Sequence, residues 1–339
     1  MKTHITCSLF LAMLWLALPS GVQAQENKNL SERVQQLEKK LVALSQISGL
    51  INVRYQYDNV KEVGSFDLRR ARIDFRGTFS PSLDYRLQLD MAGSPKVLDA
   101  YLRWKIDPGF NLQFGEFKIP FSIENPYSPM NLEVIENSVV ITRLSGYTDV
   151  STIRSNGRDI GIGLHGSFLA RKGFTIVNYS IGLFNGNGIN TTDNNKSKDF
   201  SGILTVNPLK TLALAAFHYN GSTTVGDNTD QRVRSGAGAK YEDARLLVRS
   251  EYITGKTGPM ESDGYYAVVG YKVTPKLQPI VKFDSFQEDT DNKDTREKHY
   301  LLGLNYMPIK NVRVAMNYAY RELTPTNQNW LGVQLYVTF

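Results

Sequence analysis

Charged residues recur at every second position in the stretch RRARIDFRGTF, which runs from Arg69 to Phe79. A strand places alternate side chains on opposite faces. One face carries Ala71, Ile73 and Phe75, and the charged face carries Arg70, Arg72, Asp74 and Arg76. Guanidinium groups bind carboxylate and phosphate through paired hydrogen bonds, so such a face can bind or steer small anions.

The same alternation continues through the next two segments. It groups Asp84, Arg86, Gln88 and Asp90 in 82–91, and Asp99, Tyr101, Arg103 and Lys105 in 96–107. Three adjacent strands would then present six basic and four acidic side chains on one patch of wall. Lys118 is a further candidate. Gly115 and Glu116 indicate a bulge before it, so alternation alone does not decide which face of the strand Lys118 is on. A charge facing lipid near the midplane costs about 2–4 kcal/mol, so this patch must be the wet face.

The segments that position these residues are short and alternate in apolar character. Sixteen such stretches follow residue 48, each close to the length of about 9–11 residues that a tilted membrane strand needs. They are 48–58, 66–79, 82–91, 96–107, 110–119, 158–168, 173–184, 198–207, 210–220, 231–241, 244–254, 264–274, 277–287, 297–307, 310–320 and 329–339.

Two kinds of connection alternate between these stretches. Short turns such as Ser80-Pro81 and Pro108-Gly109 alternate with longer polar segments. The longer segments include 185–197, 220–230, 255–263, 288–296 and 322–328. This alternation is typical of an up-and-down membrane barrel and not of a sandwich with crossover connections. We therefore expect an all-β fold, a sixteen-stranded antiparallel transmembrane β-barrel over 48–339. Trp104, Tyr306 and Tyr320 would face lipid near strand ends.

The N-terminus has the pattern of a secretory signal peptide. Lys2 precedes an apolar run, and Val22-Gln23-Ala24 provides small residues for cleavage after Ala24. We expect residues 1–24 to be removed, together with Cys7, the only cysteine. The remaining chain would hold 38 basic against 33 acidic residues, because Lys2 is lost from the 39 of the whole sequence. This balance is too mildly basic to indicate nucleic-acid binding.

A helical segment is expected at 25–47. Apolar residues recur there at spacings of four and three, at Leu30, Val34, Leu37, Leu41 and Leu44. This spacing is that of a heptad seam and favours a short coiled coil, with a solvated amphipathic spacer as the alternative. We expect the segment to be periplasmic if the barrel spans an outer membrane.

The connection 120–157 is too long for a simple turn, and loops of more than about 15 residues are usually functional or disordered. Its apolar residues would let it fold into the barrel and narrow the channel. Its charged candidates are Glu124, Glu133, Glu136 and Arg143. An acidic loop opposite a basic wall would set up a transverse field that steers polar solutes. The alternative is a cap outside the barrel with solvated charges.

Three blocks of the chain resemble a known family. RRARIDFRGTFSPSLDYRLQLD (69–90), AYLRWKIDPGFNLQFGEFKIPFSIEN (100–125) and RDIGIGLHGSF (158–168) are similar to the phosphate-selective porin O/P family of Gram-negative outer membranes. The FKIPFS stretch is the most specific part. The resemblance implies a sixteen-stranded barrel, usually a homotrimer, with its third outer loop folded into the pore. It also implies that the C-terminal Phe339 is recognised by the barrel-assembly machinery.

The chain departs from the family pattern in its loops. The resemblance implies basic third and fifth outer loops, but here the third is acidic and the fifth, NGSTTVGDNTDQ, has no lysine or arginine. We therefore predict an outer-membrane porin for passive diffusion of small hydrophilic solutes, with a preference for phosphate or other small anions. Outer-membrane lipid and lipopolysaccharide would surround it. No nucleic acid, cofactor or metal site is expected.

Two other functions are considered. A barrel hydrolase would need a histidine placed beside a nucleophile. His165, His218 and His299 lie on separate strands with no catalytic motif around them, so we predict that the protein is not an enzyme. A barrel without a channel, used for adhesion or as a scaffold, would differ from a porin in showing no conductance.

Overall fold

The computed structural model describes residue 33, residues 46–226 and residues 228–339. The predicted signal peptide and all but the last two residues of the predicted coiled coil, apart from Arg33, lie outside these ranges. Those last two residues begin the first strand. Within the described ranges, no helix has the length and apolar character to cross a membrane.

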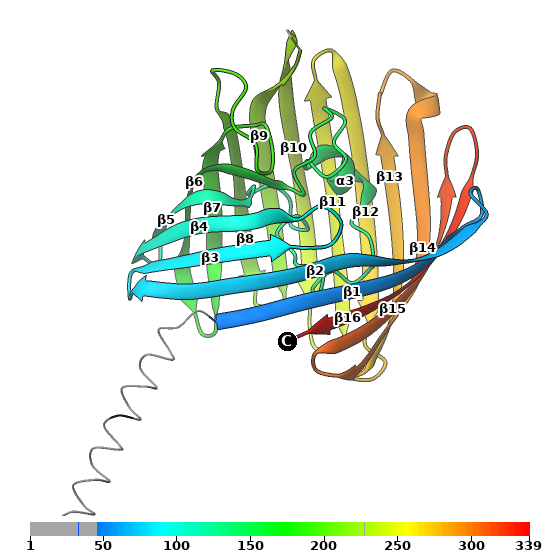
Figure 1. Cartoon of the computed structure of the whole chain (residues 1–339), viewed down its shortest axis with the longest axis horizontal. Helices are drawn as coiled ribbons and strands as arrows, with labels where there is room; N and C mark the ends of the chain where they lie inside the picture. Colours follow the sequence, from blue (N-terminus) through cyan, green and yellow to red (C-terminus); the bar gives the residue numbers. More distant parts are fainter. Residues whose placement is uncertain (1–32, 34–45, 227) are drawn as a thin grey trace, which may run out of the picture. The chain divides into compact units, whose positions relative to one another are not determined.

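The described chain is almost entirely β-strand (Figure 1). The strands are β1 (Gln46–Asp58), β2 (Val63–Ser80), β3 (Leu83–Asp90), β4 (Lys96–Asp107), β5 (Phe110–Lys118), β6 (Arg158–Arg171), β7 (Phe174–Phe184), β8 (Asp199–Leu209), β9 (Leu212–Val225), β10 (Asn228–Glu242), β11 (Leu246–Thr257), β12 (Met260–Tyr271), β13 (Leu277–Gln287), β14 (Arg296–Ile309), β15 (Val312–Glu322) and β16 (Gln328–Thr338). A short helix, α3 (Val139–Leu144), interrupts the connection between β5 and β6.

Each strand pairs with its sequence neighbours in an antiparallel ladder, and β1 also pairs with β16. The sheet is therefore a closed barrel of sixteen strands, which confirms the fold expected from the sequence. Closure leaves no unpaired sheet edge, as a hydrocarbon environment requires. The C-terminal residue completes the seam, because Phe339 and Gly49 exchange backbone hydrogen bonds of 2.9 and 3.2 Å.

Two of the polar segments expected to be loops are mostly strand. The described parts of 220–230 and 255–263 extend the hairpins β9–β10 and β11–β12, and in the second hairpin only residues 258–259 connect the paired strands. Polar composition was a poor guide here because backbone pairing continues past the apolar part of a membrane strand. The taller strands β9 to β12 are visible at the upper part of the barrel in Figure 1.

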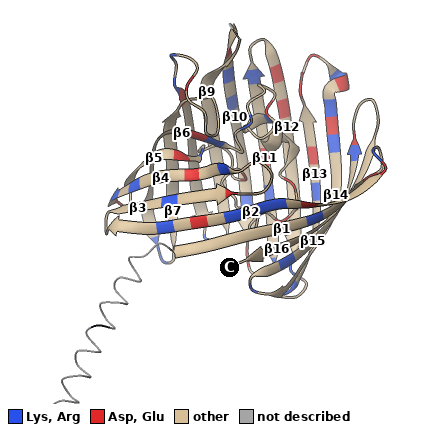
Figure 2. Ribbon diagram, in the orientation of Figure 1, with Lys and Arg blue, Asp and Glu red and all other residues tan. Residues whose placement is uncertain are grey.

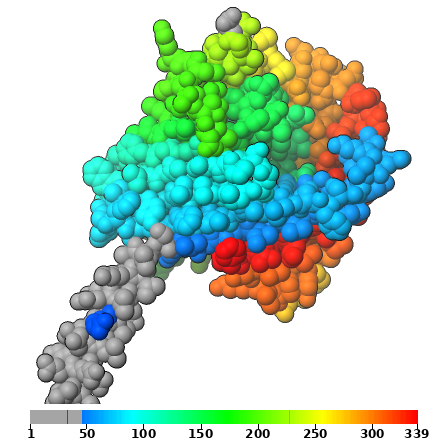
Figure 3. All heavy atoms as spheres, in the orientation of Figure 1, coloured from blue at the N-terminus to red at the C-terminus, as the bar shows by residue number. Residues whose placement is uncertain are grey.

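The outer surface is apolar, and several of its aromatic residues lie near strand ends. Trp104 and Tyr306, both expected to face lipid, are 50% and 48% exposed near the short turns. A second group crosses β12 to β15, where Phe283 lies 5.7 Å from Tyr265 and 5.1 Å from Tyr300 between ring centroids. The space-filling view shows β1 to β4 as a continuous surface (Figure 3). Aromatic bands at both ends of an apolar surface are typical of membrane barrels.

The connection between β5 and β6 packs against the inner side of the barrel. Val140, Ile141 and Leu144 of α3 are fully buried, and α3 contacts β11, β12 and β13. Phe121 packs edge-on against Phe217 of β9, with ring centroids 4.8 Å apart. Part of the lumen is thus a hydrophobic core formed between this connection and the wall.

We predict that Ile73→Arg destabilises the folded barrel by about 2–4 kcal/mol, because Ile73 is exposed on the outer face in the middle of β2. The measurement is the denaturant midpoint of protein refolded in vesicles. Ile73→Ala controls for lost volume and should cost clearly less. Equal stability of the arginine variant and the wild type would show that this face is not in lipid.

Candidate solute channel

A cavity of about 730 Å³ lies inside the barrel between the loop 119–157 and the wall. Ser48 and Thr338, near the short turns, line it together with Glu297 and Arg321, near the opposite strand ends. The cavity therefore runs along the barrel. Ten basic side chains line it, namely Arg69, Arg70, Arg72, Arg76, Arg86, Lys118, Arg143, Arg158, Lys282 and Arg321. Four acidic ones do so: Asp74, Glu136, Asp284 and Glu297.

The structure brings most of the basic candidates together. Arg70, Arg72, Arg76, Arg86 and Lys118 all line the cavity. Blue and red bands along β2 mark the charged residues of this wall (Figure 2).

Two basic candidates lie elsewhere. Arg103 and Lys105 are not part of the cavity lining, and both pair with Asp84, at Nη2–Oδ2 and Nζ–Oδ2 distances of 2.8 and 3.3 Å. They are close to the short turn after β4, below the level of the cavity.

Arg69 lines the cavity although strict alternation from Arg70 would turn it toward lipid. The register explains its position, because Asn52 pairs with Arg70 while the next residue, Val53, pairs with Leu68. Arg69 is the extra residue of a β-bulge, so two consecutive arginines face inward. The Arg69-Arg70 pair is the sequence signal for this bulge, because a regular strand would expose one of the two arginines to hydrocarbon.

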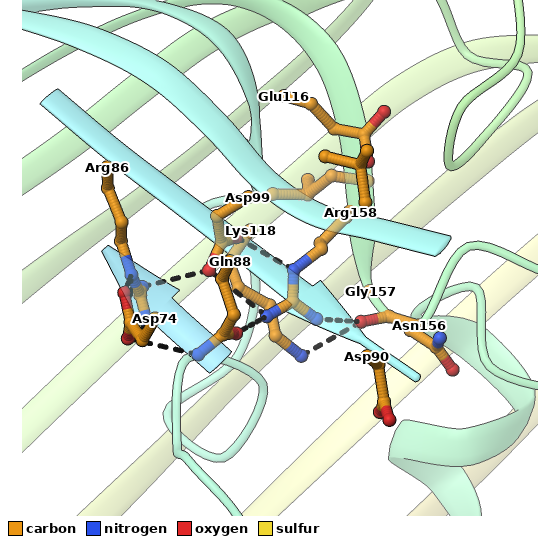
Figure 4. Close-up of polar contacts among 12 residues, drawn as sticks. Asp74, Arg86, Gln88, Asp90, Asp99, Glu116, Lys118, Asn156, Gly157 and Arg158 are labelled. Atoms are coloured by element: carbon orange, nitrogen blue, oxygen red, sulfur yellow. Dashed lines mark hydrogen bonds and ion pairs between the residues drawn. The ribbon is translucent and has the colours of Figure 1, made fainter. Parts of the chain in front are cut away.

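An ion-pair network covers the wall formed by β2, β3, β4 and β6 (Figure 4). Arg86 bridges two carboxylates, with 2.7 Å from Nη2 to Asp74 Oδ2 and 2.9 Å from Nη1 to Asp99 Oδ2. Arg158, which the alternation analysis missed, is buried and reaches Asp99 Oδ1 at 2.8 Å. Arg158 is the first residue of β6 and directly follows the long loop, so no alternating pattern on both sides of it predicts which way it faces.

The flanking arginines of β2 are also paired. Arg72 Nε lies 2.9 Å from Asp90 Oδ2, and Arg76 Nη2 lies 2.8 Å from Asp74 Oδ2. Arg70 differs, since the described residues give it no ion pair and its buried Nη1 has no hydrogen-bond partner. Arg70 is therefore the guanidinium of this wall that is least neutralised.

Lys118 fixes the loop to the wall, and its ammonium group is not free to bind a solute. Its ammonium group donates to the oxygens of Asn125, Tyr147 and Asn156, and it also lies 4.7 Å from the Tyr147 ring centroid. All three of its donors thus have neutral acceptors in the loop. The first turn of that loop is fastened in turn by Glu251, which accepts hydrogen bonds from Ser122 and the Ile123 amide.

Two of the acidic loop residues are not directed at the basic wall. Glu124 and Glu133 are buried and pair with Arg249 of β11, at Nη2–Oε2 distances of 3.2 and 2.9 Å. Glu136 does line the cavity, and it accepts from Arg54 at 3.2 Å and from Arg321 at 3.0 Å.

Arg143 also lines the cavity, and its Nε lies 3.5 Å from Glu297 Oε1. Glu124 and Glu133 thus pair with β11, and Glu136 contacts arginines on both sides of the seam, including Arg69 of β2 at 3.8 Å. Most of the loop carboxylates that were expected to set up a transverse field opposite the basic wall are therefore not available for it.

Asp149 anchors the far end of the loop. It is fully buried between two arginines of β10, with 3.1 Å from Oδ2 to Arg232 Nη2 and 3.2 Å from Oδ1 to Arg234 Nη2. Burial alone would raise the pKa of Asp149, but the two guanidinium groups and the Ser151 hydrogen bonds outweigh it and lower the pKa to about 2.

The geometry defines a class of protein: a membrane barrel whose charged lumen is narrowed by an internal loop. Comparison with known sequences then gives the family. The family described as "Phosphate-selective porin O and P" matches residues 48–242 and 219–333. The chain belongs to this family and is an outer-membrane porin. No match is found among curated proteins.

Three solved structures with a similar fold are distant in sequence. An anion-selective porin from Comamonas acidovorans is 13% identical, with a TM-score of 0.68 over 87% of this chain and 99% of that chain. The trimer form of OmpT from Vibrio cholerae is 14% identical, with a TM-score of 0.60 over 87% and 99%. OmpF of Salmonella typhi, in complex with daunomycin, is 13% identical, with a TM-score of 0.62 over 88% and 98%. At these identities the likeness supports the fold.

We predict that Asp149→Asn loosens the loop, because two buried arginines lose their counterion at a cost of about 3–5 kcal/mol. Larger open-channel current noise and higher mean conductance should follow. Since the folded pKa lies below the ordinary 3.8, the carboxylate stabilises the loop above that pH. This stabilisation disappears as the pH falls through about 2.

The difference between variant and wild type should therefore be constant from about pH 5 to 8 and shrink toward pH 2. Asp193→Asn, which removes the carboxylate that pairs with Lys198 in another loop, is the matched control. A pH-independent difference, or noise in the control as well, would contradict the role of Asp149.

Proposed function

We propose that this porin is a diffusion channel with a weak preference for small anions. The surplus of positive charge on one wall of the cavity carries this proposal. Seven basic side chains of β2, β3, β5 and β6 (Arg69, Arg70, Arg72, Arg76, Arg86, Lys118 and Arg158) adjoin three aspartates (Asp74, Asp90 and Asp99) and Glu136, which leaves three positive charges unbalanced. A cationic wall beside water raises the local concentration of anions and favours their entry.

A strict phosphate filter is not part of the proposal. Dehydrated phosphate needs several free donors, and most donors on this wall are already engaged. Lys118 donates to three neutral oxygens, and most of the arginines pair with carboxylates. The name of the distant anion-selective porin agrees with the direction of selectivity proposed here.

The first test concerns the wall charge. Arg70→Gln should lower the chloride-to-potassium permeability ratio about two- to fivefold, the range expected for up to ~1 kcal/mol from one charge at ~4 Å in water. The measurement is the reversal potential in a KCl gradient across a planar bilayer. Arg103→Gln is the matched control, because Arg103 lies outside the cavity lining and should leave the ratio unchanged. Equal effects of the two variants would argue against a role for the β2 arginines.

The second test concerns phosphate. We expect millimolar phosphate to leave the chloride current of the wild type essentially unblocked, because no described group of free donors surrounds a single position in the cavity. Titration of phosphate at constant ionic strength measures this. Saturable block at millimolar concentration would instead establish a specific phosphate site.

Several features of assembly are also proposed. The chain would be a homotrimer with its N-terminal segment in the periplasm, and Phe339, 63% exposed, would be read by the barrel-assembly machinery. The proposed homotrimer is based on the trimer form of the distant OmpT of Vibrio cholerae. Light scattering of the detergent-solubilised protein tests it, and a monomer mass would reject it.

The proposal includes no enzymatic activity. His218 contacts Ser235 at 2.9 Å between Nδ1 and Oγ, but this pair is exposed on the barrel surface away from the cavity. Among the described residues, no cluster of histidine and acidic side chains could hold a metal. A barrel without conductance is the remaining alternative, and the absence of stepwise openings from correctly folded protein would favour it.

A further inference from the structure

The channel cavity has an apolar side in addition to its cationic side. Pro126, Pro129, Met130 and Val139 of the loop line it, with side chains that are exposed or half-buried. Leu301 and Trp330 of the wall are buried and also line the cavity. Most contacts of the loop are with β9–β15, with further attachments to Arg54 of β1 and Lys118 of β5, whereas the surplus arginines are on β2–β6. The apolar loop residues and the surplus arginines therefore line different parts of one cavity, and Arg143, Lys282 and Arg321 add charge on the loop side.

Packing of the loop does not account for this apolar surface. The side chains that attach the loop to the wall, such as Leu132, Ile135 and Ile141, are buried. Met130 and Val139 pack only partly against that core and keep the rest of their surface in the cavity. An exposed apolar surface in a narrow aqueous passage lowers the free energy of a solute that can cover it.

The cationic side offers one guanidinium that is suited to a passing anion. Arg70 lines the cavity and has no ion pair among the described residues, and its buried Nη1 has no hydrogen-bond partner. Its neighbours Arg72 and Arg76 are held by Asp90 and Asp74. An anion that reaches this level of the channel meets Arg70 without having to displace a carboxylate.

We propose that the channel favours organic anions with an apolar body, such as arylsulfonates and arylcarboxylates, over small anions of the same charge. The anionic group contacts Arg70 while the ring covers Met130 and Val139. The cavity of about 730 Å³ can hold a single aromatic ring with its hydration on the charged side. This inference rests on the anion preference proposed above and adds the class of solute.

Benzenesulfonate and methanesulfonate separate the two properties, because both stay fully ionised and differ only in the apolar body. The full-length protein is placed in a planar bilayer, and the permeability ratio of the two anions is taken from the bi-ionic reversal potential with a common potassium concentration. Free diffusion gives a ratio below one, since the aryl anion is larger. We expect a ratio of about three to ten for the wild type.

Near-isosteric variants test the residues. Met130→Gln and Val139→Thr, which change polarity at almost constant volume, should together bring the ratio below one while leaving the chloride-to-potassium ratio within about 1.5-fold. Met130→Leu, which keeps the apolar character, should keep the high ratio. Arg70→Gln should lower the permeability of both sulfonates by a similar factor. Heat-modifiability on gels confirms that each variant is folded.

The possible failures are distinguishable. A wild-type ratio below one in a channel that still prefers chloride to potassium would overturn this inference alone. A ratio that stays high in the double variant would also overturn it, because the named residues would not be the cause. A wild-type channel that prefers potassium would instead overturn the proposed anion preference on which the inference rests.

Discussion

Hydrocarbon tolerates neither an unpaired backbone group nor a charge, and the architecture of this protein follows from that exclusion. Pairing of β1 with β16 removes the last free edge. Every strand must keep its apolar residues outward, so the charged residues between them have to face the lumen. The lumen then contains more charge than an aqueous passage requires, and most of it is neutralised in chains of ion pairs such as Asp74–Arg86–Asp99–Arg158.

The same exclusion explains the division of the lumen. Inward residues of β9 to β14 include Phe217, Ile253, Tyr266 and Phe286, which would be out of place in a water-filled channel. The loop covers them. Its buried acidic residues pair with Arg249, and its apolar residues pack against this apolar wall. A dry half and a wet half result, and solute passes only through the wet half. The main role of the loop is therefore structural, and it affects selectivity only through its few side chains that face the cavity.

Much of this arrangement could be predicted from local patterns. Alternation located all sixteen strands and the inward direction of Arg70, Arg72, Arg76 and Arg86, because a period of two is a local property. Partners distant in sequence could not be predicted: Arg249 meets Glu124 across 125 residues, and Arg232 meets Asp149 across 83. For this reason the loop acids were expected to oppose the basic wall, and the pairs that remove Glu124 and Glu133 from it became visible only in three dimensions.

The bulge at Arg69 also bears on how such a wall can change over evolutionary time. Loss of one residue from a regular part of β2 would reverse the phase of all that follows and expose charges to lipid. At the bulge, the extra residue can be lost and the ladder simply becomes regular, with one guanidinium fewer in the channel. Insertion and deletion at this single position could therefore adjust the charge of the passage in unit steps while the barrel around it stays intact.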